Sequence, residues 1–227
     1  MFKREHHQKI DRLLRMLNAR FLQDTNCFFG GGTAISLLLG EYRESIDVDF
    51  LCADQAGYRQ LRSSVFDHDL GDLFSIPPTL LRDVRADQYG IRAVLLIDAI
   101  PIKFEIVRES RIALSGMIDA TLPVPVLNRE DMFAEKLLAN ADRFADKSVL
   151  SRDVIDIAMM EINWGTIPAS AWIKTEDAYG KSVKTSFNKA KEILRTDRTY
   201  FSRCMTTMGI AVDDENRIRR ALGMRRK

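Results

Sequence analysis

Two short motifs carry residue types suited to chemistry on phosphates. Gly31-Gly32-Thr33 is a glycine turn, and Asp47-Val48-Asp49 begins fourteen residues after Thr33. Residues at i and i+2 of a strand share a face and lie about 6 to 7 Å apart, so Asp47 and Asp49 could both ligate Mg²⁺. A glycine turn that opens a helix offers backbone N–H groups to phosphate. The spacing therefore predicts a site for a metal ion and a phosphate group.

A third acid, Glu105, lies on a separate predicted strand that also carries Lys103 on its polar face. Glu105 could complete the metal site, and two metal ions held this way suit in-line phosphoryl or nucleotidyl transfer. The alternative for Glu105 is an ion pair with Lys103 or a neighbouring arginine. For the two aspartates, the alternative is a pair of solvated acids on an edge strand.

The segment GGGTAISLLLGEYRESIDVDF resembles the first motif of the nucleotidyltransferase superfamily. Arg43 and Ser45, placed just before the two aspartates, make it most similar to the AbiEii/AbiGii toxin-like branch. That branch has a lysine helix and an Arg-Asp helix downstream. The matching residues here are Lys136 and Arg143 in EDMFAEKLLANADRF, and Arg152, Asp153 and Asp156 in SRDVIDIAM.

The resemblance implies a nucleotide-binding, Mg²⁺-dependent transferase that uses an NTP, with Mn²⁺ as an alternative metal. Such proteins are often the toxin of a bacterial toxin–antitoxin or phage-defence pair, with tRNA ends as the acceptor in some relatives. A cognate antitoxin or its operon is then the expected partner. The implied nucleotide-binding residues are Gly31, Gly32, Thr33, Arg43, Ser45 and Lys136; the implied metal ligands are Asp47, Asp49 and Glu105; and Lys136 and Asp153 join the two aspartates as catalytic residues.

Two positions depart from the superfamily pattern. Gly32 stands where many members have serine, so a hydroxyl contact to phosphate is missing or shifts to Thr33. Glu105 replaces an aspartate that is common elsewhere. Physical alternatives also remain for the downstream helices: Lys136 and Arg143 could form a solvated basic stripe, and Asp153 could serve only to hold them.

Other enzyme and binding functions stay open. The acceptor could be a small molecule such as an amino sugar, or a protein hydroxyl. The chain could also be a nucleotide-binding module without turnover. The glycine turn lacks the spacing of a P-loop or a dinucleotide-binding fold, and no nucleophile elbow indicates a serine hydrolase.

The elements that would position these residues follow from apolar periodicity. We predict a first helix over residues 3–22, a strand in CFFG, a helix from Thr33 to Gly40, a strand over 45–52 and a helix over 55–74. Two strands, 90–97 and 101–107, would form a hairpin. Further helices are expected over 128–144, 151–160 and 181–194, with a mostly helical remainder.

This order predicts an α+β fold, with a nucleotidyltransferase-like mixed sheet flanked by helices and then a mainly helical C-terminal half. Pro123 and Pro125 mark the expected junction, so we predict domains at 1–125 and 126–227, the second completing a cleft.

Charge and hydropathy limit the expected partners and location of the protein. The chain has 34 Lys and Arg against 32 Asp and Glu, a net charge of +2, so RNA binding would need a local basic patch. The uncharged stretch at 25–40 is short and broken by glycine, and the N-terminus lacks a signal peptide, so a cytoplasmic location is expected. Six basic residues in 216–227 could contact RNA or form a frayed tail.

Cysteines and histidines give little sign of a site. Cys27, Cys52 and Cys204 have no metal-binding spacing, so disulfides and zinc are not expected. The three histidines, His6, His7 and His68, lie in charged, surface-like segments without metal spacing, and no ligand or catalytic role is predicted for them.

Overall fold

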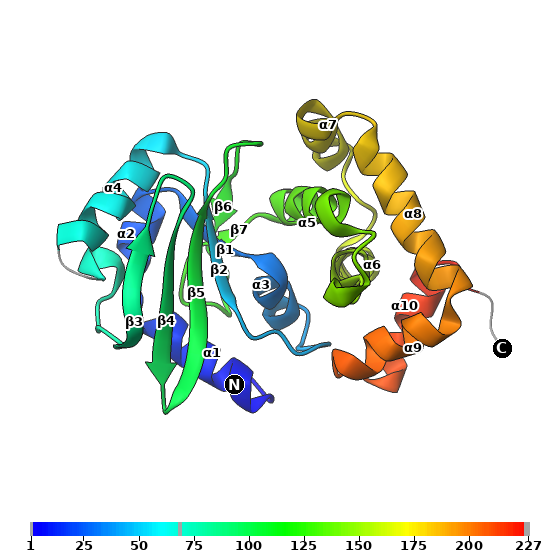
Figure 1. The fold of residues 1–227 in the computed structure, drawn as a ribbon, viewed down its shortest axis with the longest axis horizontal. Coiled ribbons are helices and arrows are strands. Elements are labelled where there is room, and N and C mark those ends of the chain that lie inside the picture. The colour runs from blue at the N-terminus through cyan, green and yellow to red at the C-terminus, as the bar shows by residue number, and fades with distance from the viewer. Residues whose placement is uncertain (1, 68–69, 225–227) are drawn as a thin grey trace. The chain divides into compact units, whose positions relative to one another are not determined.

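The computed structural model describes residues 2–67 and 70–224, which form two compact units (Figure 1). The first unit contains the residues up to Leu38 together with Ser45–Asn128. The second contains Leu39–Glu44 together with the residues from Arg129 onward. The short segment 39–44 therefore packs with the helical half of the chain although it lies far from that half in sequence. His68 and Arg225–Lys227 lie outside the described residues.

The first unit is built on a mixed sheet, which confirms the predicted fold class. In the described part of the chain the strand order is β3-β4-β5-β2-β1-β7-β6, with parallel pairs at β2/β5 and β1/β7. The strands are β1 (Cys27–Gly30), β2 (Val48–Cys52), β3 (Thr79–Ala86), β4 (Gly90–Ile97), β5 (Ile100–Arg108), β6 (Gly116–Met117) and β7 (Val126–Leu127).

One face of this sheet forms the core. Phe29, Phe50 and Phe104 are buried on neighbouring strands, with ring centroids 5.3 Å apart for Phe29 and Phe50 and 5.7 Å apart for Phe50 and Phe104. Alternating burial along β4 and β5 places their apolar residues on this side. The helices of the unit are α1 (Glu5–Met16), α2 (Ala19–Asp24), α3 (Gly31–Leu38) and α4 (Gln55–Asp67), with a short 3-10 helix at Gly71–Leu73.

Several predicted boundaries were wrong. The predicted helix over 3–22 is two helices, because Leu17 forms a bridge with Phe74 and the Asn18 side chain then caps α2 by accepting from the Phe21 N–H at 3.1 Å. The predicted helix over 55–74 ends at Asp67. Strand β3, at the sheet edge, was not predicted, since its residues show little apolar alternation.

The β4–β5 hairpin is confirmed, with a shorter turn than expected. Asp98 and Ala99 both have positive φ, 48° and 66°, which is the geometry of a tight two-residue hairpin turn. Ile100 therefore already belongs to β5. Each residue of β4 pairs with a residue of β5, from Gly90 opposite Val107 to Ile97 opposite Ile100.

The second unit is helical. It contains α5 (Arg129–Arg143), α6 (Arg152–Trp164), α7 (Ala169–Tyr179), α8 (Ser182–Thr196), α9 (Arg198–Thr207) and α10 (Val212–Ala221), with a 3-10 turn at Lys147–Val149. Tyr42 and Arg43 of the inserted segment are buried in this unit. None of the helices in residues 2–67 and 70–224 is long and apolar enough to cross a membrane.

The three cysteines are buried free thiols. Cys27 lies opposite Cys52 in the register of β1 and β2, so two residues distant in sequence are neighbours in the sheet. Burial raises the pKa of both thiols, that of Cys52 to about 12. They are therefore protonated, unreactive core residues at neutral pH.

Candidate functional site

The glycine turn places the start of α3 beside an aspartate. β1 ends at Gly30 and α3 begins at Gly31, two residues earlier than the sequence indicated. Gly31 has φ of 69°, and a Cβ there would lie 2.9 Å from Asp49 Oδ2. A side chain at this position would therefore be strained and would press on the carboxylate. The first N–H groups of a helix lack intrahelical partners, so they can bind an anion at this point.

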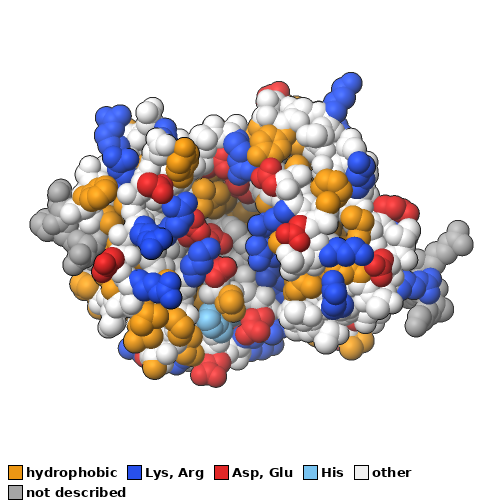
Figure 2. All heavy atoms as spheres, viewed as in Figure 1, with side chains coloured by type: hydrophobic (Ala, Val, Ile, Leu, Met, Phe, Trp, Pro, Cys, Tyr) orange, Lys and Arg blue, Asp and Glu red, His pale blue; other side chains and the backbone are white. Residues whose placement is uncertain are grey.

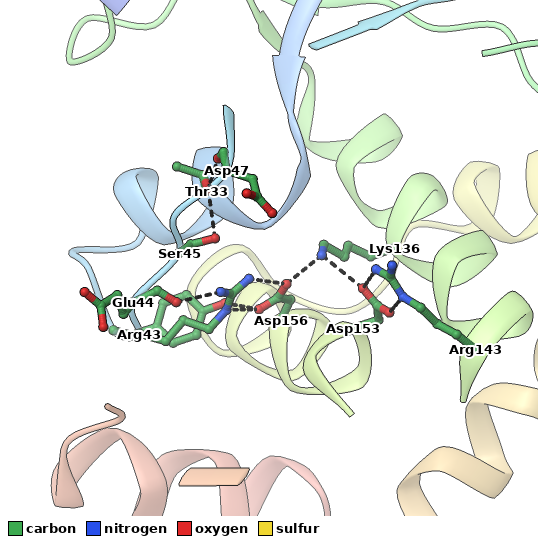
Figure 3. A network of polar contacts seen from close by, with 10 residues as sticks. Thr33, Arg43, Glu44, Ser45, Asp47, Lys136, Arg143, Asp153 and Asp156 are labelled. Carbon is green, nitrogen blue, oxygen red and sulfur yellow. Dashed lines mark hydrogen bonds and ion pairs between the residues drawn. The ribbon is translucent and has the colours of Figure 1, made fainter. Parts of the chain in front are cut away.

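Thr33 and Ser45 hold the loop that leads into β2. The buried Thr33 hydroxyl donates to the Asp47 carbonyl and lies 2.8 Å from Ser45 Oγ (Figure 3). These contacts join the first turn of α3 to the segment that carries Asp47. In the structure the two hydroxyl groups thus position the backbone around the aspartates.

Two histidines contribute to the same loop, which sequence reasoning missed. His7 is fully buried, and its Nε2 accepts the Ser45 N–H at 3.2 Å. His6 Nε2 lies 3.0 Å from the Ile46 carbonyl. The expectation of surface histidines was wrong for His7. No sequence signal pointed to it, because the contact joins residues that are far apart in the chain.

The acids of the predicted metal site lie on neighbouring strands. Asp49 of β2 pairs in register with Glu105 of β5, and Asp47 immediately precedes β2. Asp47 and Asp49 are half-buried, whereas Val48 between them is fully buried. The predicted strand from residue 45 thus begins only at Val48, with Asp49 on the face away from the aromatic core.

Glu105 is held by two cations. Arg92 Nε lies 2.7 Å from Glu105 Oε1, and Lys103 Nζ lies 3.1 Å from Oε2. Partial burial opposes the charged form of Lys103, but the hydrogen bond to Glu105 and the charges of Glu105, Asp47 and Asp49 raise the pKa of its ammonium. Lys103 therefore stays protonated and supplies positive charge beside the acids.

The donor set fits a magnesium ion held by two aspartates. Within residues 2–67 and 70–224, no group of three or more His, Cys, Asp or Glu side chains is arranged to hold a metal. Mg²⁺ is commonly bound by one or two carboxylates, with waters and substrate phosphates completing the octahedron. Asp47 and Asp49 beside a helix N-terminus meet this requirement. Glu105, neutralised by Arg92 and Lys103, is a poorer ligand.

The second unit contains the other predicted residues in a buried ionic network. Asp156 is fully buried and accepts from Arg43 at 2.6 and 2.9 Å and from Lys136 at 2.7 Å (Figure 3). The Tyr42 hydroxyl also donates to Asp156. Asp156 thus bonds to residues from α5 and the 39–44 segment, although Arg152 stands one turn away on the same helix.

Asp153, on α6, extends this network to a second basic residue of α5, Arg143. It accepts from Lys136 at 3.1 Å and from Arg143 at 2.6 and 2.9 Å. This is the contact pattern expected if Asp153 holds the two basic residues in place. Lys136 is 5% exposed, so its ammonium is enclosed between Asp153 and Asp156.

The charges of the network determine its protonation. Burial alone would raise the pKa of Asp156, but Arg43 and Lys136 hold that pKa well below its usual range. Burial likewise opposes ionisation of Asp153, and Lys136 and Arg143 lower its pKa. The network therefore consists of ionised groups that neutralise one another away from water.

Comparisons with known proteins agree with this architecture. The family model for the nucleotidyl transferase AbiEii toxin of type IV toxin–antitoxin systems matches residues 12–222. The crystal structure of JHP933 from Helicobacter pylori is similar with a TM-score of 0.56 at 16% identity, covering 98% of this chain and 90% of that one.

A putative nucleotidyltransferase from H. pylori is similar with a TM-score of 0.53 at 17% identity, covering 96% of this chain and 90% of that one. At these identities the likeness concerns the fold. The search of curated proteins found no match.

Proposed function

Because the chain belongs to the AbiEii family of nucleotidyltransferase toxins of type IV toxin–antitoxin systems, we propose that it transfers NMP from an NTP to an acceptor hydroxyl with Mg²⁺ bound by Asp47 and Asp49. The observation that carries the proposal is the position of the Asp49 carboxylate against Gly31 at the start of α3. Two carboxylates beside the N–H groups of a helix N-terminus suit a metal-bound triphosphate.

The residues of the first unit have separable roles in this proposal. The backbone of Gly31 and Gly32 binds phosphate oxygens, and Asp47 and Asp49 bind the metal. When bound, the metal polarises the phosphate and stabilises the charge that develops in the transition state. Thr33 and Ser45 act by positioning the Asp47 backbone, while Lys103 and Arg92 fix Glu105 at the border of the site.

Lys136 and Asp153 are proposed to act differently. The resemblance assigns Lys136 to the nucleotide phosphates, but its ammonium is paired with two buried carboxylates. We propose that Asp153 positions Lys136 and Arg143 and does not itself take a proton from the acceptor. A Lys136→Met variant that binds NTP normally but unfolds more readily would support a purely structural role for the lysine.

The first experiment is a transfer assay. Purified protein is incubated with Mg²⁺, each α-labelled NTP in turn and total cellular tRNA. Asp49→Asn should abolish incorporation while the fold is retained, and Asp24→Asn, which changes an exposed acid on α2, should leave it unchanged. Incorporation that survives Asp49→Asn would contradict the metal assignment.

The acceptor and partner are separate parts of the proposal. Label in tRNA would identify RNA as the acceptor. Label only in a small molecule or a protein would identify that molecule as the acceptor instead. NTP binding without release of pyrophosphate from the NTP, whichever acceptor is offered, would indicate a nucleotide-binding module. Growth arrest on expression, relieved by a cognate antitoxin, would support the toxin role that family membership implies.

A further inference from the structure

The outer face of β3, β4 and β5 carries a group of basic side chains that the proposed chemistry does not use. Register places Asp49, Glu105, Arg92 and Arg85 in one row across β2, β5, β4 and β3. Directly paired residues project to the same side of a sheet. The acidic end of this row is the proposed metal site, and the other end is arginine.

A second row runs beside the first. Lys103 pairs with Val94, and Val94 pairs with Arg82 of the edge strand. Arg82, Arg85 and Lys103 are exposed and Arg92 is half-buried. Figure 2 shows Lys and Arg side chains gathered over this part of the first unit, with acidic side chains among them. We name Arg82, Arg85, Arg92 and Lys103 the basic sheet face.

The charges on this face are only partly balanced. Arg92 pairs with Glu105 and Asp87, and Lys103 pairs with Glu105. The side chains of Arg82 and Arg85 form no ion pair or hydrogen bond with any other residue of the part that the structure describes. Arg85 stands directly opposite Arg92, and like charges facing each other across a sheet are unfavourable without a counter-charge. Asp83 is the one acid within β3.

An exposed aromatic ring lies in the turn between β3 and β4. Tyr89 precedes β4 and is 66% exposed. Its backbone is held, because its N–H donates to Asp87 Oδ1 at 2.7 Å and its carbonyl accepts from the Arg108 N–H at 2.9 Å. A solvent-exposed ring on a held backbone is a surface on which a nucleic acid base can stack.

We propose that the basic sheet face and Tyr89 bind a single strand of RNA. Strands lie about 4.8 Å apart, so the face extends about 14 Å from β3 to the aspartates on β2. Arginines pair well with phosphate, and the ring favours a nucleic acid over a free polyphosphate.

The test measures binding in the absence of NTP and Mg²⁺, so it does not depend on turnover. The probe is a fluorescein-labelled single-stranded RNA of about twelve nucleotides, followed by anisotropy at several salt concentrations. The double variant Arg82→Gln/Arg85→Gln should bind at least about tenfold more weakly at low salt. Its slope of log K against log [salt] should fall by about 1.4, because two phosphate contacts are lost.

Matched controls separate this surface from general charge. Arg59→Gln/Arg62→Gln removes two exposed arginines of α4, which contacts β2 and β3, and should leave affinity and slope unchanged. Tyr89→Ala should weaken RNA binding by about tenfold with the salt slope retained, since stacking releases no counterion.

Several outcomes would overturn the inference. They are equal binding by the Arg82/Arg85 variant and the wild type, equal losses in the α4 control, or binding of inorganic triphosphate but not of the RNA strand. Transfer to RNA with normal binding by the Arg82/Arg85 variant would leave the proposed function intact and remove this surface. Arginine-dependent RNA binding without transfer would support this surface and contradict the proposed function.

Discussion

The two units use charged residues in opposite ways. In the second, Asp156 and its partners are almost fully buried and every charge is enclosed by an opposite one. In the first, Asp47, Asp49 and Glu105 are half-buried, and Glu105 pairs with Arg92 and Lys103, whose side chains are partly exposed. A buried ionic network affects stability, because removing one partner leaves a buried charge unpaired. A partly exposed site contributes little to stability, and its side chains can exchange their partners for a ligand.

The largest effect is expected from Asp156→Asn. The variant leaves Arg43 and Lys136 with reduced compensation inside the second unit, so the free energy of unfolding should fall by about 3 to 5 kcal/mol. Urea unfolding followed by circular dichroism measures the change. Asp49→Asn serves as the contrast, and its midpoint should stay close to that of the wild type. Similar losses in both variants would remove the distinction between the units.

Acid should act on the buried network first. The folded-state pKa values of Asp153 and Asp156 lie below that of an unfolded aspartate, about 3.9. The unfolded chain therefore binds more protons once the pH drops below about 5, and stability declines as the pH falls further through the folded pKa. The wild-type urea midpoint should drop more steeply below about pH 5 than that of Asp156→Asn. Parallel curves of urea midpoint against pH would mean that Asp156 does not contribute to the loss of stability in acid.

An intermediate effect is expected for Gly31→Ala. The substitution places a side chain at positive φ and against Asp49 Oδ2, which should cost about 1 to 2 kcal/mol of stability. NTP binding, measured by calorimetry, should weaken as well, because the new methyl group shifts the carboxylate and blocks the helix N–H groups. Gly40→Ala, a positive-φ glycine with open space around it, controls for backbone strain alone. Equal NTP affinity in both variants would contradict a phosphate site at Gly31.

The smallest stability effect is expected for Glu105→Gln. Its partners Arg92 and Lys103 are 39% and 51% exposed, so water replaces the lost ion pairs and the change should stay below about 1 kcal/mol. Thermal unfolding checks the stability, and Mn²⁺ titration checks the metal. Mn²⁺ affinity should change little if Asp47 and Asp49 are the ligands. A large loss of affinity would restore Glu105 to the metal site.

The glycine turn, the paired aspartates and the β4–β5 hairpin could be predicted because each depends on residues close in sequence. Gly31 and Asp49 lie within one motif, and alternation along residues 90–107 marks two strands without any distant contact. The family resemblance rested on the same local motifs. The edge strand β3 was missed because an exposed edge lacks the apolar pattern that indicates a strand.

The sequence by itself determined the type of most helices and strands, the order of the motifs and the identity of the acids, since these depend on local periodicity and residue chemistry. Tertiary structure decided the partners. It joined Arg43 to Asp156, enclosed Lys136 between two carboxylates and buried His7 against Ser45. It also aligned Arg85 and Arg92 with Glu105 across the sheet. Such contacts depend on strand register and on the packing of segments far apart in the chain, which spacing along one sequence does not specify.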